Sequence, residues 1–342
     1  EKIKYFKEIL ADENKLLDVI KTEICEIKNK YNDERRTSII NNPGEIDIED
    51  LIEEETSVIT LSNLNYIKRT PLDTYKSQNR GGKGIIGMQT REEDFVKSLF
   101  VSSTHDTILF FTNLGRVYKI KGYQIPEAGR TARGMAMVNL LEISAGESIT
   151  AVIPVKEFSE DKYLVMVTKN GIIKKTDMMS YANIRKGGLN AINLKDEDEL
   201  ISVLITEDND DIFVATHNAM GIRFKAEDAR AMGRVATGVR AIKLRGDDFV
   251  ICADIITDDM KVLNVTENGY GKRTVASEFN TQNRGGIGVK IHQITEKTGK
   301  LVSIVMVNEN EEVMLITSDG VIIRLRGADI STYGRTSQGV KL

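Results

Sequence analysis

The sequence predicts an all-β protein, a ring of six four-stranded blades, preceded by an α-helical segment. Short runs of β-branched and aromatic residues, interrupted by Gly, Asn and Asp, begin near residue 56 and continue through the rest of the chain. Six of these runs have the same order: a strand, a hydroxyl residue, a tight turn and a second strand. The first 40 residues instead have apolar residues at helical spacing.

The N-terminal segment, residues 1–40, is predicted to be helical. Its apolar residues are separated mostly by three or four positions: Ile3, Phe6, Leu10, Leu17, Ile20, Ile24, Ile27 and Tyr31. The sequence "ADEN" at 11–14 can divide the segment into two helices, with a cap at Asp12 or Asn14. We favour a helix packed against a neighbouring helix over a long independent coiled coil, and expect the partner of the apolar stripe to lie outside this chain.

Residues 41–55 are predicted to form an acidic linker. Seven acidic residues and no basic residue lie between Glu45 and Glu55, after the sequence "NNPG". Residues 1–55 carry 9 basic and 16 acidic residues, whereas residues 56–342 carry 38 basic and 35 acidic ones. The net charge of −4 therefore does not exclude a polyanionic partner, which responds to a local basic surface.

Residues 56–342 are predicted to form six hairpin-bearing repeats. The hydroxyl residues before the turns lie 50, 56, 48, 50 and 51 residues apart: Ser62, Thr112, Thr168, Thr216, Thr266 and Thr317. Asn-Gly and Asp-Gly turns between such runs favour hairpins, because these residues accept the positive φ of a tight turn. A closed ring buries both faces of every blade, and no capping unit is recognisable, so closure is favoured over an open β-solenoid.

A series of arginines and glycines follows the hairpins. In five of the six repeats an arginine lies 18 residues after the hydroxyl residue, and a glycine four residues further on. The pairs are Arg80 with Gly84, Arg130 with Gly134, Arg234 with Gly238, Arg284 with Gly288 and Arg335 with Gly339. In the shorter third repeat Ile184 takes the arginine position, beside Arg185, Lys186 and Gly188, and extra bases are present at Lys83 and Arg133.

This series predicts a surface for phosphate groups. Arginine presents a planar fork of donors that matches phosphate oxygens, and neighbouring glycines let backbone N–H groups approach an anion. One such loop per blade would place cations at regular intervals around one rim, which suits a bent polyanion and offers little means of reading bases. The alternative is six similar turns that are merely solvated.

Gly82, Gly84 and Gly87 also match the G-x-G-x-x-G spacing of dinucleotide sites. A dinucleotide loop occurs once, between a strand and an amphipathic helix. Here the motif belongs to a six-fold series, "QNRGGIG" at 282–288 is its near copy, and "IIGMQTREEDF" provides no such helix. We therefore predict no nucleotide cofactor in this chain.

A second basic series lies seven residues after the hydroxyl residues: Arg69, Lys119, Lys175, Arg223, Arg273 and Arg324. Acidic residues follow in most repeats: Asp73, Asp177, Glu227, Glu278 and Asp329. Salt bridges inside each blade are slightly favoured over a ligand-binding role.

The remaining reactive residues indicate no catalytic or metal site. Cys25 and Cys252 have no zinc-like or disulfide-like spacing, which predicts a reducing cytoplasm, and the three histidines are isolated. No transmembrane stretch or signal pattern is present, and the abrupt start "EKIKYFKEIL" suggests a piece of a longer protein. A propeller whose rim binds acidic proteins is the main rival to a nucleic-acid binder. An enzyme with its site in the central channel has little support, since no constellation of His, Asp, Glu or Ser recurs there.

The segment "QNRGGKG" resembles the box Q-R-R-G-G-[RK]-G that marks the C-terminal domain of DNA gyrase A subunits. "YIKRTPLDTYKSQNRGGKGIIGMQTREEDFV", "FVSSTHDTILFFTNLGRVYKIKGYQIPEAGRTARG" and "NDERRTSI" are also typical of that family, and the resemblance covers essentially the whole chain. Carried over residue by residue, the box is Gln78, Asn79, Arg80, Gly81, Gly82, Lys83 and Gly84. Asn79 departs from the usual Arg of the family and removes one cation.

The resemblance implies a six-bladed β-pinwheel over residues 56–342, in which neighbouring blades exchange a strand. Residues 1–40 then look like the end of the helical part of the preceding breakage-and-reunion domain. It further implies sequence-independent binding, bending and wrapping of duplex DNA, which directs strand passage in ATP-dependent negative supercoiling. The implied partners are duplex DNA, the gyrase B subunit, and a second copy of the gyrase A chain in an A2B2 assembly, with ATP and Mg on the B subunit.

No residue of this chain matches the motif of the family's catalytic tyrosine, so the fragment alone is predicted to have no catalytic residue, metal or cofactor. The related domain of topoisomerase IV, which lacks an intact box and recognises DNA geometry, is the alternative within this superfamily.

Overall fold

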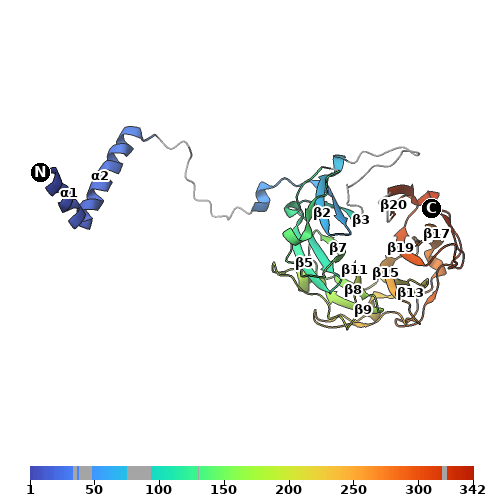
Figure 1. The fold of residues 1–342 in the computed structure, drawn as a ribbon. Coiled ribbons are helices and arrows are strands. Elements are labelled where there is room, and N and C mark those ends of the chain that lie inside the picture. Colours follow the sequence, from blue (N-terminus) through green and yellow to red (C-terminus); the bar gives the residue numbers. More distant parts are fainter. Residues whose placement is uncertain (34–36, 38–47, 75–93, 130, 318–321) are drawn as a thin grey trace. The chain divides into compact units, whose positions relative to one another are not determined.

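The computed structural model describes the 342-residue chain except residues 34–36, 38–47, 75–93, 130 and 318–321 (Figure 1). The chain divides into two compact units, Glu1–Leu51 and Ile52–Leu342.

The first unit contains two helices, α1 (Lys2–Ala11) and α2 (Glu13–Tyr31), and the 3₁₀ turn η1 (Ile48–Leu51). Asp12 separates the helices and caps α2, since its carboxylate accepts a hydrogen bond from the backbone N–H of Asn14 at 3.0 Å. The predicted break and the cap at Asp12 are thus confirmed. The apolar stripe is exposed, with Leu10 78% and Ile27 60% accessible.

The second unit is built from one antiparallel hairpin per repeat. The hairpins are β1 (Thr56–Ser62) with β2 (Tyr66–Pro71), β4 (Thr107–Thr112) with β5 (Arg116–Lys121), β8 (Tyr163–Thr168) with β9 (Ile172–Asp177), β12 (Asp211–Thr216) with β13 (Met220–Lys225), β16 (Lys261–Thr266) with β17 (Tyr270–Val275), and β20 (Glu312–Ile316) with β21 (Ile322–Arg326).

The repeated hydroxyl residue closes the hairpin turn. In the first five hairpins its oxygen accepts a hydrogen bond, 3.1–3.3 Å long, from the backbone N–H four residues later: that of Tyr66, Arg116, Ile172, Met220 or Tyr270. The residue just before each donor has positive φ: Asn65, Gly115, Gly171, Ala219 and Gly269. Glycine and asparagine tolerate this conformation best, which explains the Asn-Gly signal.

Two further strands complete each of five sheets. The third strands face the centre of the arc in Figure 1 and contact their neighbours from β7 to β19; they are β3 (Val96–Ser103), β7 (Ile149–Val155), β11 (Leu200–Thr206), β15 (Val250–Ile256) and β19 (Leu301–Val307). The fourth strands have two residues and form the outer edge: β6 (Met135–Ala136), β10 (Leu189–Asn190), β14 (Val239–Arg240), β18 (Val289–Lys290) and β22 (Val340–Lys341).

Each fourth strand belongs to the following repeat. β6, from the second repeat, pairs with β2 of the first, and β22, from the sixth repeat, pairs with β17 of the fifth. A 3₁₀ turn follows each hairpin: η2 (Leu72–Thr74), η3 (Gly122–Gln124), η5 (Met178–Tyr181), η6 (Ala226–Asp228), η7 (Ala276–Glu278) and η8 (Gly327–Asp329), with η4 (Met137–Asn139) after β6.

The predicted six-bladed ring is wrong. The described residues form five four-stranded sheets and one two-stranded sheet, β20–β21. The sequence prediction counted hairpins, but a complete sheet also needs an outer strand from the next repeat. In the described residues β22 of the sixth repeat pairs in the fifth sheet, and neither an inner nor an outer strand pairs with β20–β21.

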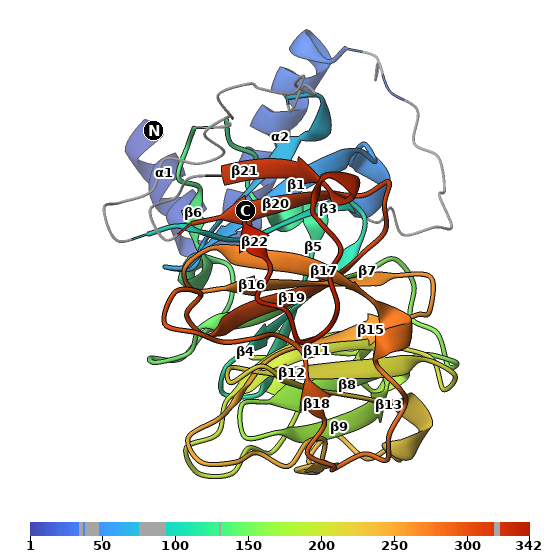
Figure 2. The ribbon, with the colours of Figure 1, turned by 90° about the vertical axis from the view of Figure 1, so that its right-hand side faces the viewer.

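The core lies between successive sheets rather than inside any one of them. Side chains of one strand alternate between two cores: Ile108 and Phe110 of β4 pack toward the first sheet, whereas Leu109 and Phe111 pack toward the third. All four are fully buried, and each contributes roughly 1.5–3 kcal/mol of burial free energy. Figure 2 shows the stacking, with β16, β17 and β19 of the fifth sheet above β12, β13 and β15 of the fourth. A strand buried on both faces explains the continuous apolar runs in the sequence.

Candidate nucleic-acid interface

Within the described residues, five of the six members of the arginine–glycine series lie in segments that run along the outer edge of the sheets. We call residues 126–136, 182–190, 229–240, 280–290 and 331–341 the rim loops. Each loop lies beside the hairpin of the preceding repeat and ends in that sheet's fourth strand, as shown by the parallel bridges from Arg223 to Thr281 and from Arg273 to Thr332. Arg130 and the whole box, Gln78 to Gly84, lie outside the described residues.

The last glycine of each rim loop is required by packing between repeats. Gly134, Gly188, Gly238, Gly288 and Gly339 all have positive φ. A Cβ at Gly134 would lie 2.3 Å from the carbonyl oxygen of Ile67, and one at Gly288 would lie 2.3 Å from that of Gly221. The glycine therefore lets the exchanged strand reach its partner, a reason that phosphate binding alone did not suggest.

Backbone hydrogen bonds join the residues just after each of three rim loops to the next rim loop. The N–H of Asn193 donates to Ala236 at 3.3 Å, and that of Lys243 donates to Gly286 at 2.8 Å. In the same way Gln293 donates to Ser337 at 3.1 Å. The loops of the third to sixth repeats thus follow one another without interruption along one edge of the molecule.

The predicted rim cations differ in what they contact. Arg133, Arg185, Lys186 and Arg234 are exposed, and the Arg133 guanidinium lies 5.5 Å from the ring centre of Tyr66.

Arg284 and Arg335 are half-buried and link adjacent loops. Arg284 donates to the carbonyl of Asp228 at 3.1 Å and also to that of Arg240, and Arg335 donates to the carbonyl of Lys290 at 2.8 Å. These two arginines fix the loops as well as adding charge.

Sequence reasoning missed three cations on the same edge. Arg240, Lys290 and Lys341 lie in the fourth strands β14, β18 and β22. Each is two residues after the last glycine of its loop, so the repeat spacing itself could have revealed them. Arg240 and Lys290 are exposed, which extends the basic edge onto the strand ends.

The second basic series serves a different purpose. The first five side chains cross to the following repeat and donate to a carbonyl in or just after its 3₁₀ turn: Arg69 to Ile125 (3.2 Å), Lys119 to Ala182 (2.7 Å), Lys175 to Ala226 (3.3 Å), Arg223 to Phe279 (3.4 Å) and Arg273 to Ile330 (2.7 Å). These contacts satisfy carbonyls at the end of the turn. The series therefore joins repeats, with little surface left for a ligand at Lys175, Arg223 and Arg273, which are less than a tenth exposed.

Several of these cations also form ion pairs, as the salt-bridge alternative required. Arg223 lies 2.6 Å from Asp211 and 2.7 Å from Asp258, Arg69 pairs with Glu55 and Glu127, Lys175 with Asp208, and Arg324 with Glu312. None of these acidic partners is among the acids that the sequence spacing indicated, which are Asp73, Asp177, Glu227, Glu278 and Asp329. Burial alone would raise the pKa of Asp211, but hydrogen bonds from Lys225 and Arg223 hold it below its ordinary value.

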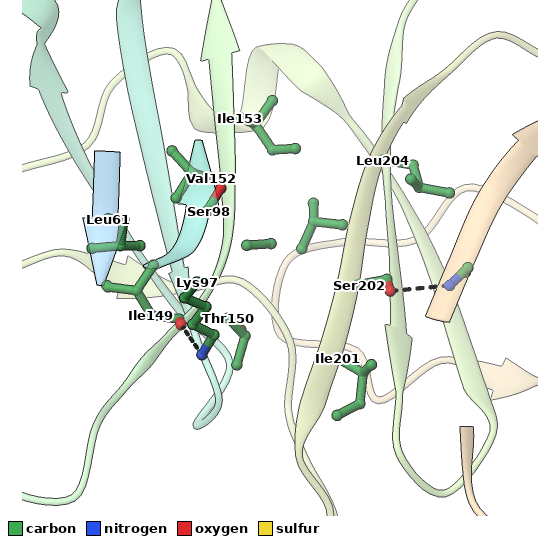
Figure 3. Close-up of a pocket in the computed structure, with 13 residues that line it drawn as sticks. Leu61, Lys97, Ser98, Ile149, Thr150, Val152, Ile153, Ile201, Ser202 and Leu204 are labelled. Carbon is green, nitrogen blue, oxygen red and sulfur yellow. Dashed lines mark hydrogen bonds between the residues drawn. The ribbon is translucent and has the colours of Figure 1, made fainter. Parts of the chain in front are cut away.

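A cavity of about 290 Å³ lies between the inner strands (Figure 3). Its lining is mostly aliphatic, with Ser98, Thr150 and Ser202 as hydroxyl groups and Lys97 as the titratable group. Lys97 donates to the carbonyl of Ile149 at 2.7 Å, and burial lowers the pKa of its ammonium group. Among the described residues, the lining of this cavity contains neither a carboxylate nor an imidazole.

The described part of the chain contains no cluster of three or more His, Cys, Asp or Glu residues suited to a metal ion. None of its helices has the length and apolarity needed to span a bilayer.

A sheet arc of tandem repeats, with exposed cations in successive rim loops, defines a propeller-like protein. The family model for "DNA gyrase C-terminal domain, beta-propeller" matches residues 56–103, 106–156, 162–207, 210–256, 261–308 and 311–342. The chain belongs to this family, the C-terminal domains of DNA gyrase A subunits.

Two relatives show how far the similarity extends. The chain is 56% identical over 336 residues to the DNA gyrase A subunit of Clostridium acetobutylicum, covering 98% of the chain and 40% of that relative. It is 57% identical over 342 residues to that of Halalkalibacterium halodurans, covering 100% of the chain and 41% of the relative. The chain thus spans about two fifths of the length of these curated relatives.

Two experimental structures have a similar fold. A DNA gyrase A C-terminal domain matches with a TM-score of 0.74 at 25% identity, covering 84% of this chain and 95% of that one. The C-terminal domain of a DNA topoisomerase IV matches with a TM-score of 0.69 at 26% identity, covering 85% and 90%.

Proposed function

We propose that this chain binds duplex DNA along its rim loops without regard to base sequence, and bends the duplex around the arc of sheets. The observation that supports it is the hydrogen bonding of successive rim loops, which aligns the exposed cations of the third to sixth repeats on one edge. Guanidinium and ammonium groups at intervals along a curved edge suit phosphates, and contacts to phosphates carry little sequence information.

The energetics of bending are compatible with such an edge. Smoothly bending a 20–30 bp duplex by 40–90° costs on the order of 1–6 kcal/mol. Several spaced phosphate contacts can offset this cost through counterion release. If about six phosphates are neutralised, log K against log salt has a slope near −5.

In the parent protein, the wrapped duplex would set the handedness of the crossing presented for strand passage. The proposal is that this domain directs ATP-dependent negative supercoiling by a cytoplasmic enzyme of two A and two B subunits, with ATP and Mg on the B subunit. Family membership and the Q-x-R-G-G-K-G box, from Gln78 to Gly84, support this assignment.

The first experiment measures binding of the chain to random-sequence duplex across a salt series, and the supercoils trapped in a relaxed plasmid by a relaxing enzyme. We expect a slope near −5 and one sign of trapped writhe. Binding to acidic proteins with no affinity for duplex would favour the protein-interaction alternative instead.

The similarity to a topoisomerase IV domain keeps a decatenating role as the second candidate. Replacing Arg80 and Lys83 together in the full enzyme separates the two. We expect supercoiling to fall far more than relaxation, with the fold intact. Unchanged supercoiling in that variant would count against a gyrase-type wrap.

A further inference from the structure

Three lysines lie completely buried at the same position of alternate hairpins. Lys68, Lys174 and Lys272 each lie six residues after the hydroxyl residue, on β2, β9 and β17, and each has no accessible surface. Tyr118 and Ile222 take this position in the second and fourth hairpins. The hairpin therefore forms without a lysine here, and a buried ammonium group is normally a cost to stability.

The three ammonium groups hold the rim loops of the following repeats. Nζ of Lys272 donates to the carbonyls of Gly334 and Arg335, at 2.7 and 2.6 Å. Nζ of Lys174 donates to the carbonyl of Arg234 and, at 2.5 Å, to that of Ala191. Nζ of Lys68 donates to Gly129 at 3.2 Å. Two of the accepting carbonyls belong to the rim arginines themselves.

A threonine two residues further along the strand adds a second contact. Thr274 donates its hydroxyl to the carbonyl of Tyr333 at 3.0 Å, and Thr70 donates to that of Ala128 at 3.0 Å. The fifth hairpin thus donates hydrogen bonds to three consecutive residues of the sixth rim loop, Tyr333 to Arg335, from inside the blade.

We propose that Lys174 and Lys272 are positioning residues for DNA binding: from inside the blade, their ammonium groups fix the backbone of Arg234 and Arg335 so that both arginines are presented at the rim. This inference rests on the proposed function. The lysines themselves are buried and do not reach a phosphate.

The charge of these lysines is titratable near neutral pH. Burial, and then the positive charge of Arg234, lowers the pKa of Lys174 to about 8. Burial also lowers the pKa of Lys272 to about 8, opposed by Glu278 and assisted by Arg335.

The other titratable neighbours are neutral over this range. Tyr181, which donates to the same Ala191 carbonyl at 3.2 Å, has a pKa raised to about 12, and His292 beside Lys272 has one lowered to about 4. Above pH 8 each amine loses its charge and one of its three hydrogen-bond donors, so its hydrogen bonds to the rim loop weaken.

Amide hydrogen exchange in the absence of DNA tests whether the hydrogen bonds from Lys272 stabilise the sixth rim loop. Relative to intrinsic rates, protection of residues 331–337 should fall by about tenfold between pH 7 and pH 9 in the wild-type chain, while β17 stays protected. Lys272→Met should have low loop protection at both pH values, and Lys272→Arg, which keeps its charge, should be insensitive to pH. Loop protection at pH 7 in Lys272→Met equal to that of the wild type would overturn the proposal.

Affinity for a random duplex of about 150 bp, one persistence length, tests the consequence. Lys174→Met/Lys272→Met should bind on the order of threefold to tenfold more weakly at pH 7, and nearly as the wild type does at pH 9. Lys15→Met/Lys156→Met, which removes two exposed lysines outside the rim loops, is the control of equal charge and should bind like the wild type.

The outcomes separate the two proposals. A loss of affinity that only parallels lower global stability and lower β17 protection would make the lysines structural and overturn the inference. If the wild type fails to bind duplex, the proposed function fails, while the exchange data still decide whether the lysines hold the loops. If the methionine variants do not fold, the pH series of the wild type against Lys272→Arg decides.

Discussion

Arg234 is the rim cation whose role is easiest to isolate, because its side chain is exposed whereas Arg284 and Arg335 also donate to neighbouring loops. We predict that Arg234→Gln weakens duplex binding and makes the salt slope shallower by about 1, with no change in sequence preference. Fluorescence anisotropy with several unrelated duplexes measures both quantities.

The matched control for Arg234→Gln is Lys156→Gln, which removes one exposed charge after an inner strand. A slope that stays the same in Arg234→Gln, or a footprint that moves to one particular sequence, would contradict the phosphate role.

The buried His292 is expected to make the stability of the fold sensitive to acid. Burial, reinforced by the charge of Lys272, lowers its pKa to about 4 from the ordinary 6.5. Between these values the unfolded chain binds a proton that the native chain does not, so stability falls as pH decreases through this window. Ile192 and Ile242 occupy the same position relative to the loop glycine in other repeats.

We therefore expect His292→Ile to be at least as stable as the wild type at pH 7 and to lose less stability between pH 6.5 and pH 4. Urea unfolding at several pH values measures the difference. Parallel stability curves for the two chains would show that His292 does not titrate in this way.

At the scale of elements, the basic residue near the end of each of the first five hairpins links its repeat to the next. Arg223 is 8% exposed, pairs with Asp211 and reaches the 3₁₀ turn η7 of the following repeat. Removing one partner of a buried pair leaves an uncompensated charge. We predict that Arg223→Met lowers the free energy of unfolding by about 3 kcal/mol.

Thermal and urea unfolding measure this loss, and the exposed Arg245→Met should change stability by no more than about 0.5 kcal/mol. If Arg223→Met instead weakened DNA binding at unchanged stability, the residue would belong to the binding surface and the structural interpretation would be wrong.

The hairpins were predictable because they are local. A hydroxyl residue and a positive-φ residue within five positions determine the turn, and apolar runs mark strands buried on both faces. The partners of the fourth strands could not be predicted from the sequence. Each of these strands has two residues, and a strand such as β18 pairs with a hairpin more than 60 residues earlier in the chain.

At the scale of the whole molecule, we expect the two compact units to unfold independently of each other, and the second unit to bind duplex without the first. Unit Ile52–Leu342 contains all the sheets, the rim loops and the hydrophobic clusters of the described chain. We expect residues 52–342 alone to unfold within about 2 °C of the whole chain and to bind duplex with the same salt slope. A large fall in either quantity would show that residues 1–51 take part in the fold or in binding.

The sequence by itself determined the repeat, its hairpin, the break between the two N-terminal helices and the loops that carry Arg234, Arg284 and Arg335, since these depend on residues close together in the chain. Only the tertiary structure decided that five sheets are complete, that the loop glycines serve packing, and that Lys174 and Lys272 hold the rim from inside. Those features arise where side chains and strands of one repeat meet the next, about 50 residues away. The spacing of residues within one repeat does not indicate which atoms of neighbouring repeats come into contact.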